Sequence, residues 1–292
     1  MSSLLSRSAE RLPLRVQLLS NADRDDLGQL LDADPVVNAV LASRLRAIGA
    51  LDPRTFGGAT YGVRSADGQL RAAAFCGGNL LPAGGVPDDW AALADRLRAQ
   101  RRPCTSIVGR DDAVRTMWDV LASSWGPART MRPSQPLLVL DAADCPRGGD
   151  RRVRLVRSQE IEAYLPAAAA MFSEELGISP HAVGSAGDYR RRVGGLIREK
   201  RAFGIVEPDG SVLFKADVGA VSAHTCQLQG VWVRPDARGT GIGTAAMPVV
   251  LRHALTLAPT VSLYVNDFNV AARRMYARLG LRETAALSTV LF

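Results

Sequence analysis

The apolar stretch Gly230-Val-Trp-Val233 is followed by Arg238-Gly-Thr-Gly-Ile-Gly243 and then by the mostly apolar stretch 244–258. A strand that turns through glycines into a helix leaves free backbone N–H groups at the positive end of the helix dipole. Such a turn binds phosphate groups, and a Cβ at the glycines would hold those groups too far away. The stretch therefore predicts a phosphate-binding loop.

Two common phosphate-binding motifs do not fit this loop. A Walker loop needs Gly-Lys-Ser/Thr, whereas the two lysines of the chain, Lys200 and Lys215, both precede the loop. A dinucleotide-binding fold places its glycines after the first strand of a domain, whereas this loop lies late in the chain and Gly243 is followed by Thr244. The pattern that remains is Arg-x-x-Gly-x-Gly.

A second pattern follows this loop in residues 263–281. Asn269, Ala272, Tyr276, Gly280 and Leu281 match Asn-x-x-Ala-x-x-x-Tyr-x-x-x-Gly-hydrophobic. Together the two motifs resemble the GNAT superfamily of acyl-CoA-dependent N-acetyltransferases. The resemblance is strong for 153–292 and weak for 1–140, and it implies acetyl-CoA as the acyl donor.

The resemblance also implies which residues hold the donor. In the family, backbone N–H groups on the strand before the loop polarise the thioester carbonyl, and that strand splays from its parallel neighbour to admit the pantetheine arm. An asparagine after the neighbouring strand would bond the amides of the arm, although Asn269 also suits a helix N-cap. The expected donor-binding residues are Val231, Trp232, Val233, Arg238, Gly239, Thr240, Gly241, Ile242, Gly243, Thr244, Asn266, Asn269 and Tyr276.

Acetyl transfer to an amine also needs a proton acceptor and a proton donor. By resemblance Tyr276 is the donor to the leaving thiolate, with a core aromatic as the alternative reading. The strand before the loop reads Cys226-Gln-Leu-Gln229 and offers no carboxylate base. The main candidates are Glu174 and Glu175, which end the helix that borders the acceptor cleft in the family, although exposed glutamates are most often only solvated. Asp217 and His224 are weaker candidates.

An internal repeat divides the chain. Residues 61–68 match residues 203–210 at a constant offset of 142, and residues 113–121 match residues 271–279 at an offset of 158. Chance similarity is the alternative, but two matched segments in the same order favour duplication. We expect an α/β fold of α+β type with two GNAT-like domains, each a mixed, mostly antiparallel sheet with a splayed parallel strand pair flanked by helices.

The first copy lacks a glycine loop, so we expect it to be a degenerate domain. The expected boundaries are a degenerate domain at 1–140, a linker at 141–152 and a catalytic domain at 153–292.

Composition limits the partners. The four cysteines stand far apart with no Cys-x-x-Cys pair and no histidine at ligand spacing, which predicts no metal site. The net charge of +7 comes from arginines spread along the chain, and aromatics make up only 5%, so we expect no nucleic-acid partner. No apolar run is long enough for a membrane span, and charged residues at the start of the chain disfavour a secretory leader. We therefore expect a cytoplasmic protein, either monomer or homodimer.

The sequence leaves the acceptor open. The main expectation is acetyl transfer to a primary amine of a small molecule, a peptide or a protein, by direct transfer in a ternary complex. The alternative is a non-catalytic protein that binds acetyl-CoA as a sensor or interaction module. By resemblance to other tandem proteins, a different acyl donor or an acceptor such as an aminoglycoside or a thiol-precursor amine also stays possible.

Overall fold

The computed structural model describes residues 14–180 and 186–292. The charged start of the chain, on which the expectation of no secretory leader rests, lies outside these ranges. Within them, no helix has the length and apolar character needed to cross a membrane.

Two halves with a similar element order build the chain, except that three helices lie between the first two strands of the first half and two lie there in the second half. The elements of the first half are β1 (Val16–Leu18), α1 (Arg24–Asp32), α2 (Ala39–Ile48), α3 (Pro53–Phe56), β2 (Gly58–Arg64), β3 (Leu70–Gly77), β4 (Leu80–Gly84), α4 (Pro87–Arg98), β5 (Ser106–Arg110), α5 (Asp111–Trp125) and β6 (Thr130–Asp141). Those of the second half are β7 (Arg154–Leu155), α6 (Ile161–Leu176), α7 (Ala186–Arg198), β8 (Ala202–Val206), β9 (Val212–Val221), β10 (Thr225–Val233), α8 (Ile242–Ala254), β11 (Thr260–Tyr264), α9 (Val270–Arg278) and β12 (Arg282–Leu291).

The repeat seen in the sequence is a structural repeat. Tyr61 pairs with Ala74 in the hairpin of β2 and β3, and Phe203 pairs with Ala216 in the hairpin of β8 and β9. Each hairpin turns at an Asp-Gly pair whose glycine has a positive φ, as at Gly68 and Gly210, a conformation that glycine adopts without steric cost. The two hairpins therefore have the same register at the offset of 142 residues.

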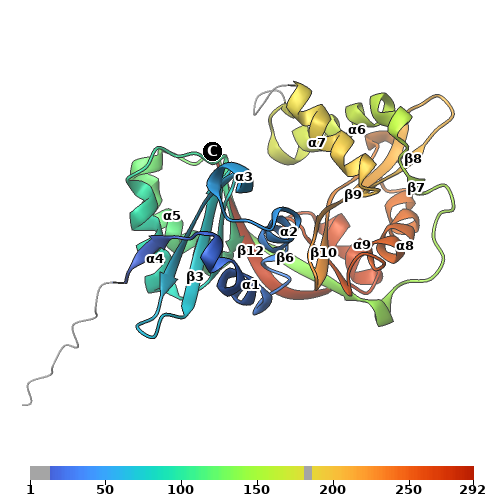
Figure 1. The fold of residues 1–292 in the computed structure, drawn as a ribbon. Helices are drawn as coiled ribbons and strands as arrows, with labels where there is room; N and C mark the ends of the chain where they lie inside the picture. Colours follow the sequence, from blue (N-terminus) through green and yellow to red (C-terminus); the bar gives the residue numbers. More distant parts are fainter. Residues whose placement is uncertain (1–13, 181–185) are drawn as a thin grey trace, which may run out of the picture.

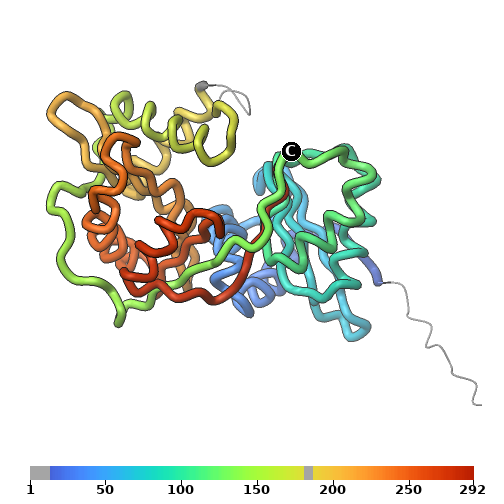
Figure 2. The backbone as a smooth tube through the Cα atoms, turned by 180° about the vertical axis from the view of Figure 1, so that it is seen from behind, coloured from blue at the N-terminus to red at the C-terminus, as the bar shows by residue number. Residues whose placement is uncertain are grey.

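The twelve strands of the described residues join one sheet, in the order β1-β2-β3-β4-β5-β12-β6-β11-β10-β9-β8-β7. Strands β1 to β6 of the first half correspond in sequence to β7 to β12 of the second. Counterpart strands lie at equal distances from the two edges of the sheet, which indicates an approximate two-fold relation between the halves. Figures 1 and 2 show the halves as two lobes, with β6 and β12 running side by side between them.

The last strand of each half is exchanged into the other half. Strand β6 pairs with β11 from Thr260↔Asp141 to Tyr264↔Leu137, and β12 pairs with β5 from Leu287↔Arg110 to Leu291↔Ser106. Each exchanged strand also adds side chains to the other half's apolar core, Leu138 and Leu140 in the second half and Val290 in the first. Each half thus depends on the other for a strand beside its splayed pair.

The segment 141–152, expected as a linker, leaves β6 and runs along α8. The N–H of Asp150 donates to the carbonyl of Ala245 at 2.7 Å, and Arg252 Nη1 donates to the carbonyl of Pro146 at 3.1 Å. The halves also meet elsewhere, because α2 packs against β9 and Arg46 Nη1 donates to the carbonyl of Ser222 at 2.9 Å. The placement of the domain boundary in this segment stays a prediction.

Candidate active site

Two parallel strands open in the second half. Strands β10 and β11 pair over three positions, from Thr225↔Thr260 to Gln227↔Ser262. Beyond Gln227 no further pair joins them among the described residues, so the strands separate toward their carboxyl ends. The glycine loop follows β10 and Asn266 follows β11, so the predicted donor-binding residues gather at this open end.

A β-bulge shapes β10 where the strands separate. Gln229 pairs with Asp217 and Trp232 with Lys215, so Gly230 and Val231 together lie opposite Ala216. A bulge re-aims backbone groups out of the ladder, and the positive φ of 58° at Gly230 favours glycine there. The backbone N–H of Val231 is thereby removed from regular pairing with β9.

The glycine loop presents a row of N–H groups. After a short turn at Pro235–Ala237, Gly239 and Gly241 take positive φ values of 78° and 89°, and a Cβ at either one would meet nothing within 4 Å. Among the described residues, no protein acceptor binds the backbone N–H groups of residues 239–244. Ala245 is the first residue after them whose N–H has a partner, the carbonyl of Gly241 at 3.0 Å. These groups form the positive end of α8, where anions bind.

The Arg238 side chain braces this loop rather than pointing outward. Its Nε donates to the carbonyl of Val233 at 2.9 Å, and its Nη2 lies 2.6 Å from Glu174 Oε2. Glu174 Oε1 accepts from Trp232 Nε1 at 3.1 Å. Both oxygens of Glu174 are thus engaged in holding α6, β10 and the loop together, which makes Glu174 the weaker of the two candidate bases.

The two asparagines differ in what holds them. Asn269 caps α9, since its side chain accepts from the N–H of Ala272 at 3.2 Å, as its position before an apolar run suggested. Asn266 Oδ1 accepts from Gln135 Nε2 at 2.8 Å, and Gln135 Oε1 accepts from Thr289 Oγ1 at 2.6 Å. Gln135 lies on β6, so the exchanged strand of the first half orients a predicted donor-binding residue of the second.

Tyr276 and Glu175 face the same region. Tyr276 is only 5% exposed, and burial, with the nearby charge of Glu175 as a smaller cause, raises its pKa far above the ordinary value. The phenol therefore keeps its proton at neutral pH, and no described residue pairs with its hydroxyl. Surrounding protein also desolvates the Glu175 carboxyl and raises its pKa, although the residue itself is exposed.

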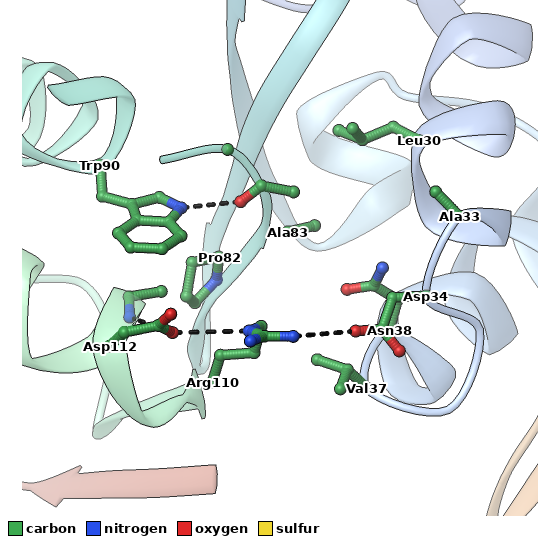
Figure 3. Close-up of a pocket in the computed structure, with 13 residues that line it drawn as sticks. Leu30, Ala33, Asp34, Val37, Asn38, Pro82, Ala83, Trp90, Arg110 and Asp112 are labelled. Atoms are coloured by element: carbon green, nitrogen blue, oxygen red, sulfur yellow. Dashed lines mark hydrogen bonds and ion pairs between the residues drawn. The ribbon is translucent and has the colours of Figure 1, made fainter. Parts of the chain in front are cut away.

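The first half has a different structure at the corresponding place. Its β4 and β5 pair only at Leu80↔Ile107, but β4 continues without a bulge and Pro82, which has no N–H, lies opposite Ala74. Only Gly85 and Val86 connect β4 to α4, so no glycine loop forms. A cavity of about 200 Å³ opens there, and Arg110 reaches across it between Asp34 and Asp112 (Figure 3).

Sequence reasoning missed Gln135 and Lys215, and it considered Asp217 only as a weak candidate for the base. Gln135 reaches the site only because β6 pairs with β11 of the other half, and no local sequence pattern in β6 predicts that pairing. Lys215 and Asp217 lie buried behind Gly230, with Lys215 Nζ 2.9 Å from the Gly230 carbonyl. Aligning the two copies does draw attention to Lys215 and Asp217, because the first copy has the apolar residues Ala73 and Phe75 at the corresponding positions.

Comparison with known families agrees with this geometry. Residues 186–281 match the model of the Acetyltransferase (GNAT) family. These residues form a GNAT domain in the carboxyl-terminal half of the chain. Residues 58–164 match a different family, described as a domain of unknown function (DUF4081), consistent with a divergent first half beside the GNAT half.

Individual relatives are distant. An acetyltransferase from the GNAT family from Colwellia psychrerythraea is 16% identical, with a TM-score of 0.55 over 95% of this chain and 99% of that one. A tandem GNAT protein from the clavulanic acid biosynthesis pathway is 16% identical, with a TM-score of 0.53 over 95% and 98%. These likenesses establish the fold across both halves.

One curated relative is the peptidyl-lysine N-acetyltransferase YjaB of Salmonella typhimurium. It is 37% identical over 57 residues, which is 20% of this chain and 37% of that relative. The match thus spans little more than a third of the relative's length.

Proposed function

We propose that the protein is an N-acetyltransferase that moves the acetyl group of acetyl-CoA to a primary amine of a small molecule, a peptide or a protein. Transfer is direct, within a complex of protein, donor and acceptor. The observation that carries the proposal is the run of N–H groups at 239–244 without protein acceptors, placed at the open end of the β10 and β11 pair. That arrangement suits a pyrophosphate with an extended arm between two strands.

The donor would lie along β10. Its phosphates would accept from the loop, and its arm would run past Val231 and Val233 toward Asn266 and Asn269. Gly239 and Gly241 leave open space on the loop where a side chain would stand. The thioester carbonyl would then meet the N–H of Val231, which the bulge frees from the ladder, and donors aimed at a developing oxyanion are a large source of rate enhancement.

Proton transfers fall to Glu175 and Tyr276. The amine nitrogen attacks the thioester carbon, the C–N bond forms, and Glu175 takes the proton that the amine gives up. The C–S bond then breaks, the thiolate receives the Tyr276 proton, Glu175 releases its proton to solvent, and the phenolate takes one up from solvent. The raised pKa values of both residues suit these roles, because a base works best with a pKa near the operating pH and the acid must hold its proton.

A primary amine on a lysine side chain is one acceptor that fits, and the short match to a peptidyl-lysine N-acetyltransferase supports testing it. Release of the CoA thiol, followed with a thiol reagent in the presence and absence of mixed primary amines, tests the proposal. We expect release that depends on the amine. Binding of acetyl-CoA without such release would instead support the alternative, a non-catalytic protein that binds acetyl-CoA as a sensor. The absence of a carboxylate from Cys226-Gln-Leu-Gln229 is consistent with that alternative.

A further inference from the structure

A buried ion pair lies directly behind the bulge of β10. Lys215 is 0% exposed, and its ammonium is 2.7 Å from Asp217 Oδ2 and 2.9 Å from the carbonyl of Gly230. The hydroxyl of Tyr164 donates to Asp217 Oδ1 at 2.8 Å. Lys215 is one of only two lysines among 36 basic residues, and its side chain has no access to solvent.

The fold itself does not require this pair. In the first half Ala73 lies opposite Gly62 as Lys215 lies opposite Gly204, and Phe75 lies opposite Thr60 as Asp217 lies opposite Ala202. The two first-half positions are equally buried and entirely apolar. Because a buried ion pair is often no more stable than an apolar pair of similar size, stability alone does not account for it.

The pair occurs together with the bulge. In the second half Gly230 and Val231 bulge opposite Ala216, whereas the first half has an unbulged strand and a proline at the corresponding place. A Cβ on Gly230 would lie 2.8 Å from Lys215 Nζ, so only glycine lets the ammonium approach the backbone this closely. Ammonium, glycine and bulge thus form one local structure, found only in the half with the glycine loop.

The planar peptide between Gly230 and Val231 connects this structure to the site. In a trans peptide the C=O and the N–H point in opposite directions, so an ammonium that holds the Gly230 carbonyl also fixes the direction of the Val231 N–H. A charged donor on the carbonyl further polarises the peptide and strengthens its N–H as a donor. Both effects act where the proposed thioester oxygen gains negative charge.

We propose that Lys215, held by Asp217 and Tyr164, is a positioning residue that aims and polarises the Val231 N–H toward the thioester carbonyl. The inference rests on the proposed function, since it assigns a part in acetyl transfer. Asp217 keeps the ammonium charged and placed, and Tyr164 fixes the carboxylate from α6. Of these four residues, Val231 touches the thioester, whereas Lys215, Asp217 and Tyr164 act through it.

The test uses the full chain with acetyl-CoA and an amine that the wild-type protein acetylates. Lys215→Met with Asp217→Leu removes both charges, so that neither is left buried alone. We expect the Kd for acetyl-CoA to stay within about twofold and kcat to fall about 10–100-fold, less than the loss of an oxyanion donor because the N–H remains but is misaligned. Val218→Ala, a buried neighbour on the same strand, is the control and should leave kcat near wild type.

Tyr164→Phe serves if the double variant does not fold, because it removes one hydroxyl and keeps the ring. We expect it to lower kcat several-fold with the Kd unchanged. A kcat within twofold of wild type in a folded double variant, or in Tyr164→Phe if only that variant folds, overturns the inference.

A second readout does not depend on turnover. In the protein labelled with ¹⁵N-valine, the Val231 amide should shift on binding acetyl-CoA more than on binding CoA, and this difference should vanish in the double variant or in Tyr164→Phe. An unchanged difference in the variants refutes the role of Lys215 even if the wild-type protein acetylates no amine. Absence of turnover in the wild-type protein itself would refute the proposed function instead.

Discussion

Replacement of Gly241 by valine tests donor anchoring at the glycine loop. Gly241 has a φ of 89°, and its missing Cβ would meet nothing within 4 Å. A side chain there is strained but does not clash, so the cost to folding is the left-handed conformation, at least about 1–2 kcal/mol. For a chain of this size that loss lowers the melting temperature by about 2–8 °C.

The effect on donor binding is expected to be larger. The added branch occupies the open side of the loop, where the N–H groups of 239–244 have no protein acceptor. Each hydrogen bond to a charged group contributes about 1.5–3 kcal/mol, and each 1.4 kcal/mol is about tenfold in affinity. Loss of one phosphate contact should therefore weaken acetyl-CoA binding about 10–100-fold, as measured by isothermal titration calorimetry.

Gly68→Val is a matched control. Gly68 has a φ of 88° and equally open surroundings, but it lies in the hairpin turn of the first half. It should lose similar stability and leave the affinity unchanged. If Gly241→Val binds acetyl-CoA as tightly as Gly68→Val does, the loop is not the phosphate site and the assignment is wrong.

Four further experiments probe the acid, the base and the exchanged strand. Tyr276→Phe removes only the proton donor and should lower kcat about 10²-fold with little change in affinity or melting temperature; turnover within a few-fold of wild type means another group protonates the thiolate. Glu175→Gln should slow transfer above the pKa of Glu175 and approach the wild-type rate below it. In the wild-type protein kcat/KM should fall as pH drops through the raised pKa of Glu175, because only the deprotonated carboxylate accepts a proton; a variant that keeps this acid limb excludes Glu175 as the base. Gln135→Leu should raise the KM for acetyl-CoA several-fold by releasing Asn266, whereas Thr289→Val, one bond further away, should have a smaller effect; equal effects would contradict orientation of Asn266 by Gln135. Residues 153–292 expressed alone should aggregate or unfold because β11 and β12 lose β6, and co-expression with 1–152 should restore them; a stable isolated fragment would show that the exchange is dispensable.

Local sequence patterns predicted the parts of the fold that local chemistry determines. The Asp-Gly turns and the apolar runs around them predicted the repeated hairpins, and the glycines of 239–243 predicted the turn into α8. The family motif brought Asn269 and Tyr276 to the same helix, and the structure places them at its start and on its buried face. The GNAT family match and the mixed sheet agree with these expectations.

Long-range pairing was beyond this reasoning. Strand β6 has the same alternating and apolar character whether it pairs within its own half or with β11, so nothing in 130–141 signals the exchange. The contact of Gln135 with Asn266 follows from that exchange. The pairing of Lys215 with Gly230 depends on a bulge, and a shift of one residue in register is not visible in either strand alone.

Isotope transfer tests the central claim most directly. The full chain is incubated with acetyl-CoA labelled with ¹³C in the acetyl group and a library of primary amines that includes lysine peptides, and the products are analysed by mass spectrometry. The proposed function predicts a labelled amide on at least one amine, formed together with free CoA. At an acetyl-CoA concentration near the wild-type Kd, its formation should be strongly reduced in Gly241→Val and kept in Gly68→Val. Labelled acetyl-CoA that binds the protein and is recovered intact with every amine would contradict it.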